Sequence, residues 1–260
     1  MSLTGFSLSS FEHEGVRRDV YRCGAGPGVV LMHETPGITP KVARLGRRLA
    51  DAGFTVVMPS LFGSPGRAPE ASYLARELSG ACVGREFSVL AMRRSSPITD
   101  WLRGLCRALH AELGGPGIGA LGMCLTGNFA LSLMVDEVVM APVLSQPSLP
   151  FPVSPWHCRA LAISDQELAI VKERVAAGVK VLGLRFSHDA MSPEARFGRL
   201  RDELGEGFEA VEVDSSPGNP YGHRRLAHSV LTEDLLDEEG QPTRQALERV
   251  VAFFQERLAP

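Results

Sequence analysis

The chain has 260 residues, of which 44% are hydrophobic and 22% are charged, and its formal net charge is -3. These values are typical of one globular domain and argue against a disordered, collagen-like or disulfide-dense chain. Basic and acidic residues are mixed along the sequence, so we expect no nucleic-acid partner. No apolar run reaches the roughly 18 residues that span a bilayer. The first residues also lack a signal peptide, so we expect no membrane partner and a cytoplasmic location.

Short β-branched runs alternate with helical patterns along the chain. Strands are predicted at residues 16–23, 28–33, 54–59, 117–122, 137–141, 179–186 and 208–213, and helices at 39–52, 97–113, 125–134, 165–177, 193–204 and 243–258. This alternation is typical of the α/β class, with a mostly parallel, doubly wound sheet covered by helices on both faces. No repeat or change in composition divides the chain, so we expect a single domain over residues 1–260.

Two segments interrupt the alternation. Residues 61–94 contain several glycines and prolines, and residues 214–241 also lack a regular pattern. Long loops inside a compact domain usually carry function or are mobile. We therefore expect residues 61–94 to shape a pocket.

The cysteines point away from a disulfide framework. They are odd in number and form no Cys-x-x-Cys pair, at positions Cys23, Cys82, Cys106, Cys124 and Cys158. This pattern also argues against a structural zinc site. We expect at least one of them to be a working thiol.

The segment from Gly122 to Gly127, Gly-Met-Cys-Leu-Thr-Gly, joins a predicted strand to a predicted helix and places Cys124 at the turn. A nucleophile-type residue on a sharp strand-to-helix turn is called a nucleophile elbow. The two glycines allow the close backbone approach that such a turn needs. The helix N-terminus beneath Cys124 would favour the thiolate. The alternative interpretation is a buried cysteine in a glycine-rich packing turn.

A cysteine nucleophile needs a base and an acid that orients the base, and on this kind of sheet they follow in the order acid, histidine. Asp189 lies just past the predicted strand 179–186, where open α/β sheets place their sites, although it could instead form an Asx-turn. Two histidines follow the last predicted strand. We favour His228, because the serine and apolar segment after it would anchor it, whereas His223 lies between a glycine and arginines and looks solvated.

With these residues in place, the chain resembles the dienelactone hydrolase family, which are α/β-hydrolase-fold enzymes with a Cys-Asp-His triad. The resemblance covers residues 29–258 and rests on four segments, HETPGI, VVMPSLFG, GMCLTGN and RFSHDAMSP. Three features differ from the family pattern, of which one is the poor match of residues 61–94. Thr126 stands where the family usually has glycine, and the loop before His228 is longer than the family's link.

The resemblance implies further site residues. It assigns Glu34 to the nucleophilic thiol, as a group that holds the resting thiol or relays its proton, although Glu34 could instead be a loop carboxylate. It places the oxyanion hole at the backbone amides of Thr35 and Leu125. It assigns Arg85 to the carboxylate of the substrate.

The resemblance predicts a hydrolase that cleaves a small-molecule ester or lactone through the Cys124 thiolate and an acyl-enzyme. A general carboxylesterase or thioesterase is an alternative, as is a catalytically silent protein that binds a small ligand. We expect no cofactor and no metal, because His33 and Glu34 are not followed by the second histidine of an HExxH zinc motif. The sequence leaves the oligomeric state open, as a monomer or a dimer.

Overall fold

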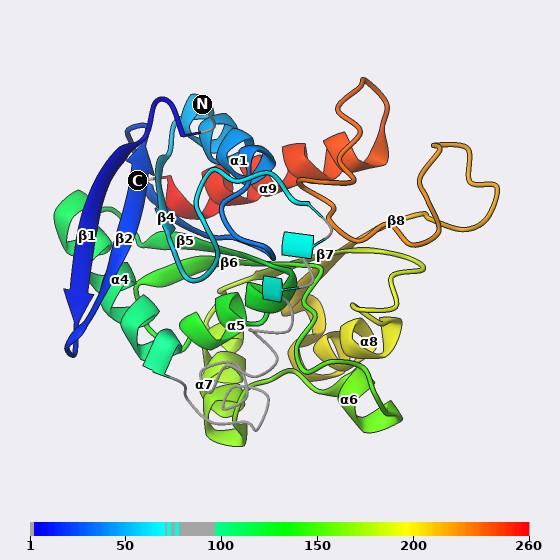
Figure 1. Ribbon diagram of the computed structural model, residues 1–260. Coiled ribbons are helices and arrows are strands. Elements are labelled where there is room, and N and C mark those ends of the chain that lie inside the picture. Colours follow the sequence, from blue (N-terminus) through cyan, green and yellow to red (C-terminus); the bar gives the residue numbers. More distant parts are fainter. Residues whose placement is uncertain (1–2, 71, 74–75, 78–96, 260) are drawn as a thin grey trace.

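The computed structural model describes residues 3–70, 72–73, 76–77 and 97–259 (Figure 1). In this part of the chain the strands form an eight-stranded sheet in the order β1-β2-β4-β3-β5-β6-β7-β8. The strands are β1 (Ser7–His13), β2 (Val16–Cys23), β3 (Gly28–Met32), β4 (Thr55–Pro59), β5 (Ile118–Met123), β6 (Val139–Ser145), β7 (Val181–Phe186) and β8 (Phe208–Val213). The pairs β1–β2 and β2–β4 are antiparallel and the other pairs are parallel. The predicted α/β class is confirmed.

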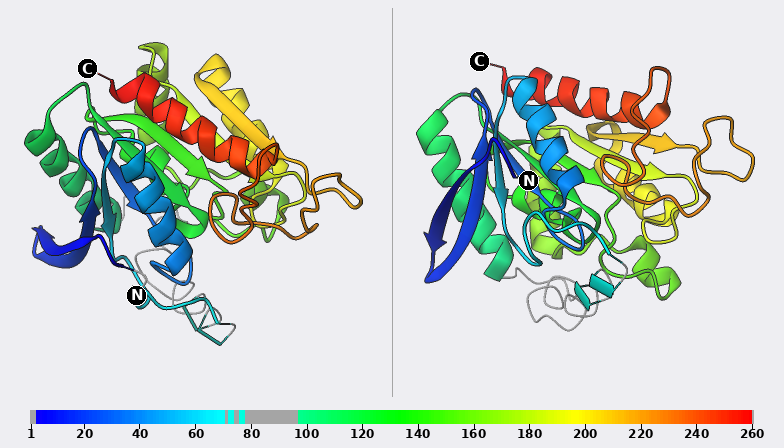
Figure 2. Two further views of the ribbon diagram at one scale, coloured as in Figure 1. Left: turned by 90° about the horizontal axis from the view of Figure 1, so that it is seen from above. Right: turned by 45° about the horizontal axis from the view of Figure 1, so that its top comes forward.

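Helices cover both faces of the sheet (Figures 1 and 2). They are α1 (Pro40–Asp51), α4 (Pro97–Leu113), α5 (Phe129–Leu133), α6 (Pro155–Arg159), α7 (Asp165–Ala176), α8 (Glu194–Leu204) and α9 (Pro242–Leu258), with short 3-10 turns η1 (Cys124–Thr126) and η2 (Gly205–Gly207). The buried side chains of α1 and α9 pack on one face of the sheet. Those of α4, α5, α7 and α8 pack on the other.

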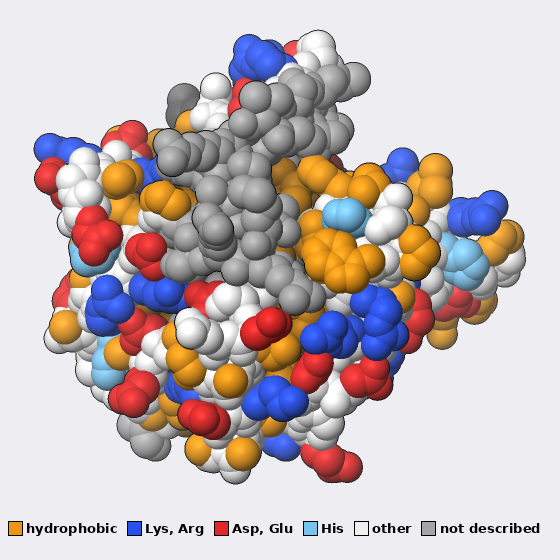
Figure 3. All heavy atoms as spheres, turned by 90° about the horizontal axis from the view of Figure 1, so that it is seen from below, with side chains coloured by type: hydrophobic (Ala, Val, Ile, Leu, Met, Phe, Trp, Pro, Cys, Tyr) orange, Lys and Arg blue, Asp and Glu red, His pale blue; other side chains and the backbone are white. Residues whose placement is uncertain are grey.

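Figure 3 shows the molecule from below, on the side of α7. On the described part of this surface, Lys and Arg side chains are interspersed with Asp and Glu side chains. No helix among the described residues is long and apolar enough to cross a membrane.

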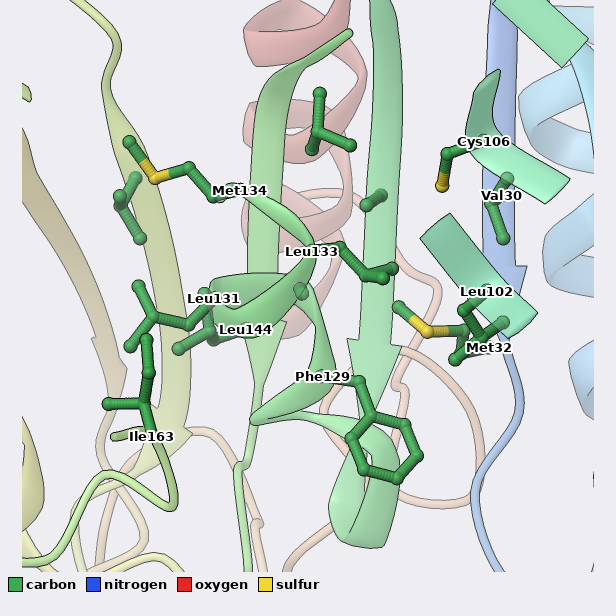
Figure 4. Close-up of a cluster of buried hydrophobic side chains, with 14 of the residues drawn as sticks. Val30, Met32, Leu102, Cys106, Phe129, Leu131, Leu133, Met134, Leu144 and Ile163 are labelled. Atoms are coloured by element: carbon green, nitrogen blue, oxygen red, sulfur yellow. The ribbon is translucent and has the colours of Figure 1, made fainter. Parts of the chain in front are cut away.

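The core beneath α4 and α5 fixes the central strands (Figure 4). Phe129 and Leu133 of α5 and Leu102 of α4 are fully buried with Val30 and Met32 of β3. Every residue of β3 and of β5 is buried. Such strands are buried on both faces, which explains their near-continuous apolar sequences.

Some predicted elements differ from the structure. The predicted helix 125–134 is wrong over its first half, because the chain passes through η1 before the shorter helix α5 begins. The predicted strand 137–141 lies two to four residues too early, since β6 covers Val139–Ser145. Strand β1 and helix α6 were not predicted. Residues 214–241 contain no helix or strand, as expected.

Candidate active site

The candidate site lies where parallel strands end. Glu34 follows β3, Cys124 follows β5, Ser148 follows β6 and Asp189 follows β7. His228 reaches the same edge from the long loop after β8. The carboxyl ends of parallel strands meet at one edge of a sheet, so the topology brings together residues far apart in sequence.

The turn at Cys124 has the geometry of a nucleophile elbow. Cys124 has a backbone φ of 55°, in the left-handed region that a non-glycine residue rarely adopts. A Cβ on Gly122 would lie 2.2 Å from the carbonyl oxygen of Thr126, and one on Gly127 would lie 2.6 Å from Cα of Pro147. Both positions therefore require glycine, as predicted. The Cys124 residue is 9% exposed, at the edge of the core.

Thr126 ties the elbow to the neighbouring strand. Its buried hydroxyl accepts the backbone N–H of Met123 at 2.9 Å. The same oxygen lies 3.0 Å from the carbonyl oxygen of Met32 and 3.1 Å from that of His33, at the end of β3. The threonine that departs from the family pattern thus supplies hydrogen bonds that glycine cannot make.

His228 stands between the acid and the nucleophile. Its Nδ1–H donates to Oδ2 of Asp189 at 2.7 Å. The ring also interacts with the Cys124 side chain, which acts on the pKa of His228 both as a charge and as a hydrogen-bond partner. Asp189 is itself fixed, because its Oδ1 accepts the backbone N–H of Met191 at 2.9 Å. Three of the predicted residues therefore form one chain of hydrogen bonds.

The neighbours of His228 favour its protonated form, the imidazolium. Burial alone would lower the pKa of His228, but interactions with Cys124 and Asp189 outweigh it and raise the pKa well above its ordinary value. A proton on His228 is thus stabilised by its two neighbours, Cys124 and Asp189.

His223 lies elsewhere. Its residue is 7% exposed, so the expectation that it is solvated is wrong. Its ring packs against Phe186 and Tyr221, with centroids 5.1 and 6.4 Å apart. Among the described residues, its Nε2 has no hydrogen-bond partner. Burial lowers its pKa, as expected of an imidazole kept neutral.

Glu34 is enclosed by neutral donors. Its carboxylate accepts the hydroxyl of Ser229 at 2.7 Å, the amide N–H of Gln146 at 3.2 Å and the hydroxyl of Thr232. In the described part of the chain, none of its hydrogen bonds goes to Cys124. Burial raises the pKa of Glu34, and the two hydroxyl hydrogen bonds oppose that rise.

His33, next to Glu34, supports the end of β3. Its Nε2 accepts the backbone N–H of Leu61 at 3.0 Å, so Nδ1 carries the proton and donates to the carbonyl oxygen of Glu34 at 3.0 Å. Burial lowers the pKa of His33 to about 4, so this ring is neutral.

The remaining predicted residues are Leu125, Thr35 and Arg85. The Leu125 amide lies in the first turn of η1, where N–H groups have no acceptor within the helix. Thr35 follows Glu34 at the same edge of the sheet. Arg85 lies outside the described residues.

Two further side chains touch His228 and were not predicted. Ser148 donates its backbone N–H to the carbonyl oxygen of Cys124 at 3.0 Å, and its hydroxyl oxygen lies 3.5 Å from Nε2 of His228. Asp234 accepts the backbone N–H of His228 at 2.8 Å. Because strand β6 was predicted too short, Ser148 was not expected at this edge of the sheet.

The described residues offer no group of three or more His, Cys, Asp or Glu side chains that could hold a metal ion. Two large apolar side chains at α6 or just before it are exposed, Val153 at 76% and Trp156 at 51%.

Comparisons with known proteins show the family of the chain. The family model described as "Dienelactone hydrolase family" matches residues 21–258. The "Putative carboxymethylenebutenolidase" of Saccharomyces cerevisiae is 29% identical over 153 residues, which cover 58% of this chain and 51% of that protein. The chain thus spans about half the length of this relative.

Solved structures share the fold. A "Putative Dienelactone Hydrolase" from Klebsiella pneumoniae has a TM-score of 0.64 at 19% identity, covering 96% of this chain and 98% of its own. A dienelactone hydrolase from Anabaena variabilis has a TM-score of 0.62 at 13% identity, covering 97% and 98%. At these identities the likeness shows the fold alone.

Proposed function

Since the chain belongs to the dienelactone hydrolase family, we propose that it hydrolyses a small ester or lactone with Cys124 as the nucleophile. The single observation that carries the proposal is the chain of hydrogen bonds from Asp189 through His228 to Cys124. A nucleophile, a base and a group that orients the base are the parts that acyl transfer needs.

In the first half of the reaction, the sulfur of Cys124 attacks the carbonyl carbon of the ester, and the thiol proton resides on Nε2 of His228. The carbonyl oxygen becomes an oxyanion held by the amides of Leu125 and Thr35. The tetrahedral intermediate then collapses. The bond to the leaving oxygen breaks, and His228 gives that oxygen its proton.

In the second half, water attacks the thioester carbon and His228 takes a proton from the water. The carbon–sulfur bond breaks and releases the acid product and the Cys124 sulfur, which shares the proton on His228 again. A thiolate is itself a good leaving group, so the first step needs a substrate whose alcohol departs easily. We therefore expect activated esters and enol-lactones to be better substrates than amides.

The decisive experiment is turnover of p-nitrophenyl acetate and of a dienelactone by the wild type and by Cys124→Ala. The wild type should turn over at least one of them, and Cys124→Ala neither. Cys158→Ala is the matched control, because Cys158 is a half-buried thiol outside the hydrogen-bonded chain and its loss should leave the rates unchanged. Equal rates for wild type and Cys124→Ala, or no rate with either, would refute the proposal.

The base is tested by a second pair of variants. His228→Ala should abolish turnover, whereas His223→Ala should retain it, because the His223 ring packs against Phe186 and Tyr221 instead of facing the thiol. The opposite pattern would make His223 the base.

The place of Arg85 remains a proposal carried by the family resemblance. If it binds a substrate carboxylate, Arg85→Ala should raise KM for a carboxylated lactone and leave KM for uncharged p-nitrophenyl acetate unchanged. Equal changes of KM with both substrates would exclude this role of Arg85.

The enzymatic alternative is a general carboxylesterase or thioesterase. Such an enzyme would show no preference for the lactone over p-nitrophenyl acetate.

The rival from another class is a silent hydrolase-fold protein that binds a small ligand. Alkylation by iodoacetamide at neutral pH separates the two. In the proposed enzyme, the thiol of Cys124 should be alkylated faster than that of Cys158. In a silent protein, both thiols should be alkylated at the rate of an ordinary thiol.

A further inference from the structure

His228 lies in a segment without regular secondary structure. No helix or strand occurs between the end of β8 at Val213 and the start of α9 at Pro242. A base must nevertheless be held within hydrogen-bond reach of its nucleophile. No strand or helix ladder fixes His228, so side-chain contacts add to the turn hydrogen bonds that hold this part of the loop.

Asp234 holds the backbone of the base. Its Oδ2 accepts the N–H of His228 at 2.8 Å and the N–H of Ser229 at 3.1 Å. Its own N–H donates to the carbonyl oxygen of Ser229 at 3.0 Å, which closes the segment into a compact turn. Arg224 donates to Oδ1 at 2.6 Å and fixes the carboxylate from the other side.

The environment of Asp234 keeps it ionised. Burial raises its pKa, but the hydrogen bonds from the His228 amide and from Arg224 outweigh burial and lower the pKa below its ordinary value. A carboxylate that accepts backbone N–H groups makes stronger hydrogen bonds than a neutral oxygen.

Glu34 binds side chains of the same segment. Its two carboxylate oxygens accept the hydroxyls of Ser229 and Thr232, the first and fourth residues after the base. Glu34 is buried at the end of β3, a strand at the centre of the sheet. It therefore connects the loop of the base to the buried centre of the sheet.

We infer that Asp234 and Glu34 are positioning residues, which act on the reaction by holding His228 between Asp189 and Cys124. The inference rests on the proposed function for its effect on turnover. It gives Glu34 a different role from the thiol contact that the family resemblance implies, because its hydrogen bonds in the described structure go to Ser229, Thr232 and Gln146.

The test measures the pKa of the His228 ring by NMR, together with kcat, in Asp234→Ala, Asp234→Asn and Glu34→Gln. Asp237→Asn is the matched control. Asp237 is a carboxylate in the same loop, but it pairs with Arg44 and Arg48 of α1 instead of the segment that carries the base.

Asp234→Ala should move the pKa of His228 toward its ordinary value and lower kcat about 10- to 100-fold, part of the 10²–10⁴-fold that a positioned base contributes. Asp234→Asn keeps an acceptor oxygen and should recover most of both losses. Glu34→Gln should act in the same direction, and Asp237→Asn should change neither quantity. The inference is overturned if the Asp234 and Glu34 variants lower only the melting temperature.

A double-mutant cycle tests the route by which Glu34 acts. If it acts through the loop, the effect of Glu34→Gln should disappear in a Ser229→Ala, Thr232→Val background, because the contacts are already lost. An undiminished effect there would overturn this route and favour a direct contact with the thiol. The NMR measurement needs no turnover, so a protein without esterase activity would refute the proposed function while still testing the positioning.

Discussion

The hydroxyl of Thr126 is expected to be a main stabiliser of the elbow, and Thr126→Val tests this. Valine keeps the shape of the side chain but removes the acceptor for the Met123 N–H and the donor to one of the nearby carbonyl oxygens. Thr126→Ser is the matched variant, since it keeps the hydroxyl and removes only the methyl group.

The structure gives the size of each effect. Each buried polar group left without a partner costs about 1–3 kcal/mol, so Thr126→Val, which leaves two such groups, should lower the free energy of unfolding by about 2–6 kcal/mol. Loss of one buried methyl group costs about 1 kcal/mol, which is the effect expected for Thr126→Ser. The hydroxyl therefore outweighs the methyl group because its neighbours Met32 and Met123 are fully buried.

Urea unfolding followed by circular dichroism measures the difference. With a slope of about 3 kcal/mol per M, the midpoint of Thr126→Val should fall by about 0.7–2 M, and that of Thr126→Ser by about 0.3 M. A valine variant as stable as the serine variant would contradict this expectation, because the hydrogen bonds of the hydroxyl would then contribute nothing.

Three further predictions concern the backbone of the elbow, the acid and the pH. Gly122→Ala should lower the melting temperature strongly, because the added Cβ would meet the carbonyl oxygen of Thr126. Gly198→Ala in helix α8 is the control: its Cβ would meet nothing within 4 Å, so it should raise the melting temperature. Equal effects of the two variants would contradict this prediction. Asp189→Asn should lower kcat for p-nitrophenyl acetate about 10²–10⁴-fold, and a wild-type rate would remove Asp189 from the site. The raised pKa of His228 means that the folded protein binds this proton more tightly than the unfolded chain. The stabilisation that this proton gives the fold should be full below about pH 6.5 and vanish as the pH rises through the pKa of His228 in the folded state. The urea midpoints of wild type and His228→Gln should therefore converge with rising pH. A gap between the midpoints that stays constant with pH would contradict the raised pKa.

The central sheet could be predicted because its strands are buried on both faces. Strands β3, β4 and β5 appear in the sequence as short, nearly continuous apolar runs. Strand β1 carries no such signal, since it is an edge strand whose residues are largely exposed. Strand β6 contains Pro142 and ends in Ser145, residues that are depleted in strands, so its carboxyl half was missed.

The site could be predicted where a local pattern carries it. The glycines around Cys124 and the position of Asp189 just past β7 were sufficient to place two side chains at one edge of the sheet. The choice of His228 over His223 could only be an inference, because the path of a long loop depends on contacts distant in sequence. Asp234 was missed for the same reason, since its role is visible only once the loop folds back on itself.

The central claim is that Cys124 carries the acyl group, and mass spectrometry of the acid-quenched reaction with p-nitrophenyl acetate tests it most directly. The account predicts the mass of one added acetyl group on the wild-type protein, located on the peptide that contains Cys124, and no such addition on Cys124→Ala. Turnover with no acetyl group on Cys124, or with the acetyl group on another residue, would contradict it.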